Sequence, residues 1–256
     1  MLRLHATSVR LTTAALLVCC TLVAHAQPQE LLSRARKGDA VAQNELGKIY
    51  MRGNGVKASP KTAFSWWMKA AEQGLPNAQT NLAQAYLLGL GTAENHQKAA
   101  HWAQKAADQN FSGGYHVLGL LHESSYSLDP ATDTARNAFK KAAEMGFAPA
   151  QHKYGERVLG GGPKYVGDPI EAEVWLRKSA EQGYGPAQYD LGTLYLDRPE
   201  FSSKPMNERC KWFYAAYAQD PDLDEGLRNH VQACNKALSK PEINAIQSTL
   251  PKPLIN

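Results

Sequence analysis

The chain has 256 residues and a formal net charge of +4 at pH 7. Residues 1–26 contain Arg3 and Arg10 and no acidic residue, so the chain without them carries a formal charge of +2. A charge this close to neutral does not favour binding to nucleic acid.

Residues 1–26 have the pattern of a secretory signal. The fourteen-residue apolar run LTTAALLVCCTLVA is followed by Ala-His-Ala, and it is too short to span a bilayer. A lipid anchor is the alternative, but a lipid-modified cysteine normally follows Gly, Ala or Ser, whereas Cys19 follows Val18 and Cys20 follows Cys19. We therefore expect cleavage after Ala26, which leaves an exported chain of 230 residues with no integral membrane segment.

A motif of about 36 residues repeats through residues 38–220. Four tryptophans, Trp66, Trp102, Trp175 and Trp212, stand 36, 73 and 37 residues apart, and Ala138 takes the Trp place in the copy hidden by the long gap. Small and apolar residues recur in the same register: Ala42, Ala78, Gly114, Ala150 and Ala187; Leu46, Leu82, Leu118, Tyr154 and Leu191; and Gly47, Ala83, Gly119, Gly155 and Gly192. We expect five copies, at 38–73, 74–109, 110–145, 146–182 and 183–220.

Each copy has the apolar spacing of a helical hairpin. In the first copy, residues 42–50 and 63–71 each place apolar residues three and four apart, on one helical face. The Trp is expected to fill the gap between hairpins, and neighbouring hairpins must stack because one alone cannot bury both faces. The predicted fold class is an all-α, right-handed α/α solenoid.

Capping residues mark the expected helix ends. Ser59, Asn95 and Asp168 stand seven residues before a Trp, and proline follows the first and the last of them. The residues that suit a left-handed helix end are Gly74, Asn110, Gly146 and Gly183.

The motif resembles the Sel-one-like repeat family, which is related to the tetratricopeptide repeats. The resemblance is carried by AQNELGKIYMRGNGV with TAFSWWMKAAEQG, and by AQTNLAQAYLLGLG with KAAHWAQKAADQN, and the copies cover about four fifths of the exported chain. The third copy departs from the pattern with His122 and the loop SSYSLDPATDT, and the fifth departs with DRPEFSSKPMN. We expect those two loops to be reshaped.

The flanks of the repeats are predicted to be caps. Residues 27–37 resemble half a hairpin, and residues 221–256 contain two further helical segments that would seal the end of the stack. Cys210 and Cys234 are the cysteines left after cleavage, and we predict a disulfide between them that stabilises the fold by about 3 to 4 kcal/mol. Two buried thiols are the alternative.

No catalytic or metal-binding motif stands out. His122 and Glu123 begin HESSY, which lacks the second histidine of a zinc-protease string, and no serine has a lysine three residues later or lies in G-x-S-x-G. We interpret the GGG at 160–162 as part of a turn between helices. His116 and His152 stand in equivalent places, but adjacent repeats separate them by roughly 10 Å, too far to share an ion without further ligands. We expect no enzyme activity, no cofactor and no metal.

The first helices of stacked hairpins are expected to line a concave surface. The residues predicted to face it lie two before and two after the repeat Leu and one turn further on: Asn44, Lys48 and Met51; Thr80, Gln84 and Leu87; His116, Leu120 and Glu123; His152, Glu156 and Leu159; Tyr189, Thr193 and Leu196. A polar groove with an apolar stripe suits a peptide or a loop of a protein partner. The alternative is that the apolar members pack against neighbouring turns.

The family resemblance implies several roles for exported members. They include periplasmic immunity proteins, which neutralise lipase or phospholipase toxins delivered by type VI secretion, and envelope adaptors in signalling or polysaccharide export. A short chain with no further domain and no catalytic site fits a stoichiometric inhibitor of a secreted toxin best. The adaptor is the alternative, and an enzyme would require an activity that depends on one polar side chain.

Overall fold

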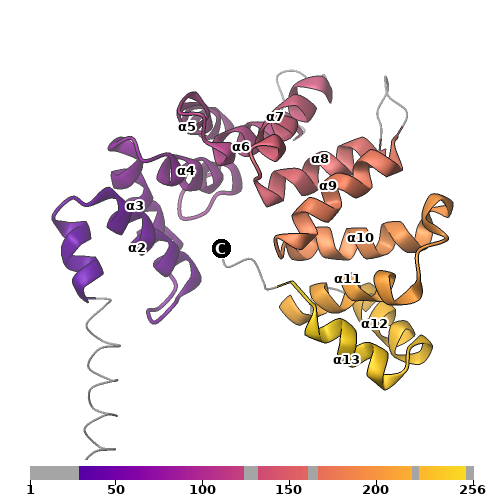
Figure 1. Cartoon of the computed structure of the whole chain (residues 1–256). Coiled ribbons are helices and arrows are strands. Elements are labelled where there is room, and N and C mark those ends of the chain that lie inside the picture. The colour runs from indigo at the N-terminus through magenta and orange to yellow at the C-terminus, as the bar shows by residue number, and fades with distance from the viewer. Residues whose placement is uncertain (1–28, 124–131, 161–166, 221–224, 252–256) are drawn as a thin grey trace, which may run out of the picture. The chain divides into compact units, whose positions relative to one another are not determined.

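The computed structural model describes residues 29–123, 132–160, 167–220 and 225–251 (Figure 1). Three predicted features lie outside the described residues. They are the signal at 1–26, most of the loop SSYSLDPATDT, and the part of the glycine turn at 161–166. Within those residues every regular element is a helix, and none is long and apolar enough to cross a membrane.

Helices follow one another in pairs along the chain. A short helix at 29–36 comes first. Five pairs follow: α2 (Ala40–Arg52) with α3 (Pro60–Glu72); α4 (Pro76–Leu88) with α5 (His96–Asp108); α6 (Ser112–Glu123) with α7 (Thr132–Glu144); α8 (Ala148–Gly160) with α9 (Pro169–Glu181); and α10 (Gly185–Asp197) with α11 (Met206–Gln219). The chain continues with α12 (Glu225–Ala237) and α13 (Lys240–Ser248), and a 3-10 turn, η1 (Pro199–Phe201), lies between α10 and α11. Packing is mainly between helices that are neighbours in sequence, which confirms the predicted α-solenoid.

The chain divides into two compact units, Met1–Trp102 and Ala103–Asn256, and the division falls within α5. The first unit contains α2, α3 and α4. The second contains α6 to α13, in which α8 packs against α9, α9 against α10, and α10 against α11 (Figure 1).

The predicted capping residues begin and end the helices. The side chains of Ser59 and Asp168 accept hydrogen bonds from the first-turn amides of α3 and α9. Gly74, Gly146 and Gly183 have positive φ, and Asn110 has a φ of 54°, so the predicted left-handed residues are confirmed. Local sequence therefore sets the length of each hairpin.

In four of the five hairpins, the residue after the repeated Trp position fills the space between the two helices of the hairpin. The repeated tryptophans lie between hairpins, as predicted, at three places: Trp66 and Trp175 are half-buried and Trp212 is fully buried, and each packs in an apolar cluster that includes the second helix of the preceding hairpin. Trp102 is half-buried. The buried side chains at the next position, Trp67, Phe139, Leu176 and Phe213, lie against the repeat glycines Gly47, Gly119, Gly155 and Gly192. The glycine lets the facing helix approach closely, and the large side chain occupies the space.

Buried glutamines connect successive hairpins. Gln43, Gln79, Gln151 and Gln188 each donate from Nε2 to a backbone carbonyl at the end of the preceding helix, over 3.0 to 3.4 Å. Each of these carbonyls also accepts a hydrogen bond from the backbone amide of the glycine that follows the helix, so the glutamine supplies an additional bond at the helix end. Three of the glutamines also accept a hydrogen bond from Gln73, Gln182 or Gln219 on the next helix. A repeated polar contact thus fixes the spacing of the stack.

The last two helices cover the end of the second unit. Leu227 and Val231 of α12 and Ile246 of α13 pack in one apolar cluster with Phe213 of α11. Cys210 of α11 and Cys234 of α12 lie in the same cluster, joined in the structure with a Cα–Cα distance of 5.7 Å. The helices therefore have the place expected of a cap, and the redox state of the cysteines in the exported protein stays a prediction.

Candidate functional site

Burial separates the predicted groove residues into two groups. The first position of each triplet is buried in four copies, at Asn44, Thr80, His116 and His152. The prediction that these four face a groove is therefore wrong. Asn44, His116 and His152 lie where a first helix meets the next hairpin, and they contact Asn81, Phe147 and Asp190 of that hairpin. Tyr189, at the same position in the last copy, is half-buried.

The second and third positions remain accessible. In the first unit these residues are Lys48, Met51, Gln84 and Leu87, all half-buried. In the second unit they are Leu120, Glu123, Glu156, Leu159, Thr193 and Leu196, which are half-buried or exposed and which we call the unit 2 first-helix surface. The role of both sets in partner binding stays a prediction.

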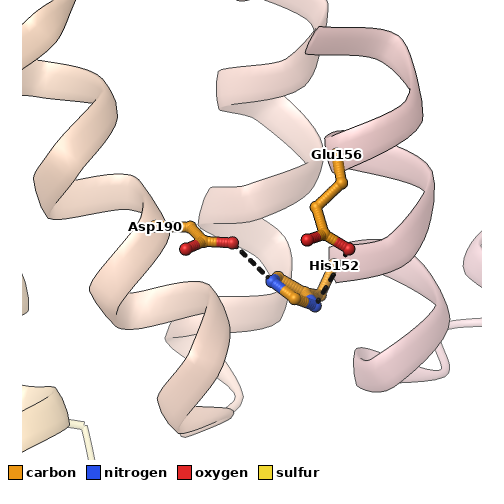
Figure 2. Close-up of side chains that lie close together, drawn as sticks. All are labelled: His152, Glu156 and Asp190. Carbon is orange, nitrogen blue, oxygen red and sulfur yellow. Dashed lines mark hydrogen bonds and ion pairs between the residues drawn. The ribbon is translucent and has the colours of Figure 1, made fainter. Parts of the chain in front are cut away.

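His152 is at the centre of a polar cluster beside the unit 2 first-helix surface. Its Nε2 lies 2.7 Å from Oδ2 of Asp190 on α10, and its Nδ1 lies 3.9 Å from Oε2 of Glu156, one turn along α8 (Figure 2). The ring also packs against Tyr184, with 5.4 Å between ring centroids. Two helices from successive hairpins thus place a carboxylate on each side of one imidazole.

Ion pairs surround this histidine. Nζ of Lys153 lies 2.8 Å from Oε2 of Glu156, and the guanidinium of Arg157 pairs with Glu123 of α6. Burial opposes the charge of Lys153, but the hydrogen bond to Glu156 and the carboxylates of Glu156 and Glu123 outweigh it and raise the pKa of the ammonium group. The cluster therefore presents both signs of charge in fixed positions.

His116 occupies the equivalent position one hairpin earlier, in a different environment. Its ring packs against Phe139 and Phe147, with centroid distances of 5.6 and 5.3 Å. Burial, with the ammonium group of Lys153 nearby, lowers the pKa of His116 to about 4. Leu120 has the same position relative to His116 as Glu156 has relative to His152. In the next copy, Lys153 takes the position that Asp190 has for His152. Two histidines in the same register thus have opposite electrostatic surroundings.

Sequence reasoning missed Lys153, Arg157 and Asp190. Two contacts share a simple relation, in which a first-position residue meets the residue that follows its own equivalent in the next copy. His152 meets Asp190 in this way, and Asn44 accepts a 2.8 Å hydrogen bond from Asn81. The repeat register contains this signal, because the contacting residue lies one place after the predicted position in the next copy.

These observations first define a class of protein. The chain is a helical-repeat protein, and the cluster in the described residues offers charges and hydrogen-bonding groups but no activated nucleophile. Comparison with protein families then identifies the repeats. A family model for the Sel1 repeat matches residues 40–75, 76–111, 148–184 and 185–199, so the chain is a Sel1-repeat protein, and no catalytic family is indicated. The third copy, which departs from the motif, is not matched.

Solved structures share this fold. A protective antigen of uropathogenic Escherichia coli with an SLR fold is 28% identical with a TM-score of 0.65, over 85% of this chain and 46% of that one. This chain therefore spans about half the length of the antigen. A Sel1 repeat protein of Oxalobacter formigenes is 26% identical, with a TM-score of 0.61, over 81% of this chain and 89% of that one.

The immunity protein Pa5087 of Pseudomonas aeruginosa has the same fold. It is 21% identical, with a TM-score of 0.54, over 71% of this chain and 66% of that one. The comparison with curated proteins gave no match.

Proposed function

We propose that this protein binds a protein partner through its first-helix surfaces and acts in the periplasm as an immunity protein. The partner is a toxin of the lipase or phospholipase class delivered by type VI secretion. The N-terminal signal pattern supports export, and the fold shared with a Pseudomonas immunity protein over 71% of this chain supports the role.

The observation that carries the proposal is the combination of fixed charges and accessible apolar groups in the second unit. Lys153, Glu156 and Arg157 are held by ion pairs on α8, and Leu159 lies one turn beyond Glu156. Leu196 of α10 is 39% exposed. Charged groups that are already ordered lose little conformational entropy on binding, and they select a partner of complementary charge.

Affinity capture tests whether these surfaces bind. Tagged residues 27–256 are used to capture proteins from an envelope lysate, beside Leu159→Glu/Leu196→Glu for the second unit and Met51→Glu/Leu87→Glu for the first. The matched control is Ile170→Glu/Val174→Glu on α9, because Ile170 and Val174 are 55% and 42% exposed and lie on a second helix. We expect the wild type and the control to capture a toxin-like protein that at least one first-helix variant loses.

A functional assay then separates inhibition from simple binding. The purified partner should lose lipase or phospholipase activity at one equivalent of this protein, and co-expression in the periplasm should protect cells from it. Capture of a sensor or polysaccharide-export complex would instead make the protein an adaptor. Retained capture by both first-helix variants would place the binding surface elsewhere.

A further inference from the structure

His152 has one ring nitrogen with a partner and one without. The side chain is buried, with 6% of its surface exposed, and Nε2 is hydrogen-bonded to Asp190 over 2.7 Å. Nδ1 is buried and has no hydrogen-bond partner among the described residues. A buried polar atom left in this way is costly, so it is a place where a further group is expected.

The contact with Asp190 prepares Nδ1 to bind a cation. A carboxylate that accepts a hydrogen bond from Nε2–H fixes the tautomer whose lone pair is on Nδ1. Metal-ligating histidines commonly have this arrangement, in which a carboxylate on the far nitrogen orients the ring and raises its basicity.

Glu156 supplies a second ligand on the same side of the ring. Residues four apart on a helix lie one above the other, and Oε2 of Glu156 is 3.9 Å from Nδ1 of His152 (Figure 2). Ligands 2.0 to 2.2 Å from a tetrahedral zinc ion lie roughly 3.3 Å apart. The side chain of Glu156 is 40% exposed, so a small rotation of it can shorten the distance from Oε2 to Nδ1 to the spacing that zinc ligands require.

We propose that His152 and Glu156 bind a zinc-like divalent cation, with Asp190 as the residue that positions the imidazole. Nδ1 of His152 and the carboxylate of Glu156 are the protein ligands, and the combination of imidazole and carboxylate suits Zn²⁺. Suitable oxygen or nitrogen atoms of His152, Glu156 and Asp190 all lie within 4.8 Å of one another. The remaining coordination positions are open to water or to a donor from a bound partner.

Lys153 competes with the cation for Glu156. Its Nζ lies 2.8 Å from Oε2, and this contact must be given up or shared when the ion binds. Lys153 is partly exposed and can turn toward solvent. Removing its charge is therefore expected to strengthen cation binding, whereas removing a ligand weakens it.

Calorimetric titration of residues 27–256 without a histidine tag tests the site, with Zn²⁺ as the probe. We expect one site whose affinity falls at least tenfold in His152→Gln and in Glu156→Gln. Asp190→Asn should lower the affinity about 10- to 100-fold, as loss of an outer carboxylate does. Lys153→Ala should raise it severalfold. The matched control is His116→Gln, because the equivalent histidine has Leu120 four residues on, and its affinity should match the wild type.

Nitrogen-15 NMR of the imidazoles supplies a second measurement that does not depend on a variant. Zinc should shift the Nδ1 resonance of His152 and leave Nε2 protonated. A spectrum showing His152 protonated on both nitrogens at pH 7.5 and unchanged by zinc would show that a proton, not a metal, satisfies Nδ1. Binding that is unaffected by Glu156→Gln, or that is lost equally in His116→Gln, would also overturn the proposal.

Discussion

Gly47 of α2 and Trp67 of α3 are in such close contact that a Cβ atom on Gly47 would lie 2.2 Å from Nε1 of the indole. The same small and large pairing recurs at Gly119 with Phe139 and at Gly192 with Phe213. Each pair lies at the centre of one hairpin. A glycine on the first helix that faces a large side chain on the second is therefore the main packing feature within these hairpins.

Changing this pair should reveal strong coupling. Gly47→Ala is expected to cost about 1 to 3 kcal/mol by overpacking, and Trp67→Ala about 3 to 5 kcal/mol by leaving a cavity. The second copy has alanine at both equivalent positions, Ala83 and Ala103, so the double variant should be less destabilised than the sum. Urea unfolding of the four proteins measures the coupling, and strictly additive costs would contradict this packing feature.

The glutamine contacts predict a polar contribution to stacking. Gln188 is fully buried, donates to the carbonyl of Ala180 over 3.0 Å, and accepts from Gln219. Gln188→Leu should lower the unfolding free energy by about 1 to 3 kcal/mol, because Nε2 of Gln219 loses its acceptor and the carbonyl of Ala180 loses one of its hydrogen bonds. Chemical denaturation measures this loss. The exposed Gln104→Leu serves as a control expected to stay within about 0.5 kcal/mol of wild type, and an equal effect of both changes would rule out the proposed role.

His116 should make stability depend on pH. Its pKa is lowered to about 4 by burial, and an unfolded histidine has a pKa of about 6.5, so between these values the unfolded chain binds more protons than the folded one. This contribution to stability is complete above pH 6.5 and is lost as the pH falls toward 4, by up to about 3 kcal/mol.

His116→Leu removes the titrating group and tests this dependence. Unfolding free energies measured between pH 4 and 7 should fall less steeply in this variant than in the wild type. The exposed His101→Leu is the control and should keep the wild-type slope. Parallel pH profiles for wild type and His116→Leu would mean that folding does not lower the pKa of His116.

The cysteines predict that reduction weakens the C-terminal cap. A bridge between Cys210 and Cys234 would close a loop with a sequence separation of 24, and its loss should cost about 3 kcal/mol. Hydrogen exchange should accelerate first in α12 and α13. The bridge would connect α12 to α11 directly, and α13 packs in the same apolar cluster. Thiol labelling of the unreduced, denatured protein checks the premise, and two labelled cysteines would contradict it.

Much of the fold follows from local patterns. Apolar spacing and recurring small residues predicted the hairpins, and capping residues such as Ser59 and Asp168 marked where helices begin. The left-handed ends at Gly74 and Asn110 were predicted in the same way. These features depend on neighbours within a few residues, which the sequence displays directly.

The candidate site was predicted less well. Helical periodicity identified the first-helix face that carries His116 and His152, but it did not show which part of that face the next hairpin covers. Asp190 lies 38 residues after His152 in sequence and 2.7 Å from it in space. Its importance depends on how far one hairpin is rotated and shifted against the next.

The sequence by itself determined the repeat, the helix ends and the α-solenoid class, because all three depend on periodic or local interactions. Only the tertiary structure decided that the residue after the Trp position fills the space within four of the hairpins, and that one of two equivalent histidines lies between two carboxylates. Burial and electrostatic environment are set by the side chains that stacking brings together. A repeat pattern specifies that hairpins stack, whereas the contacts depend on the offset between them.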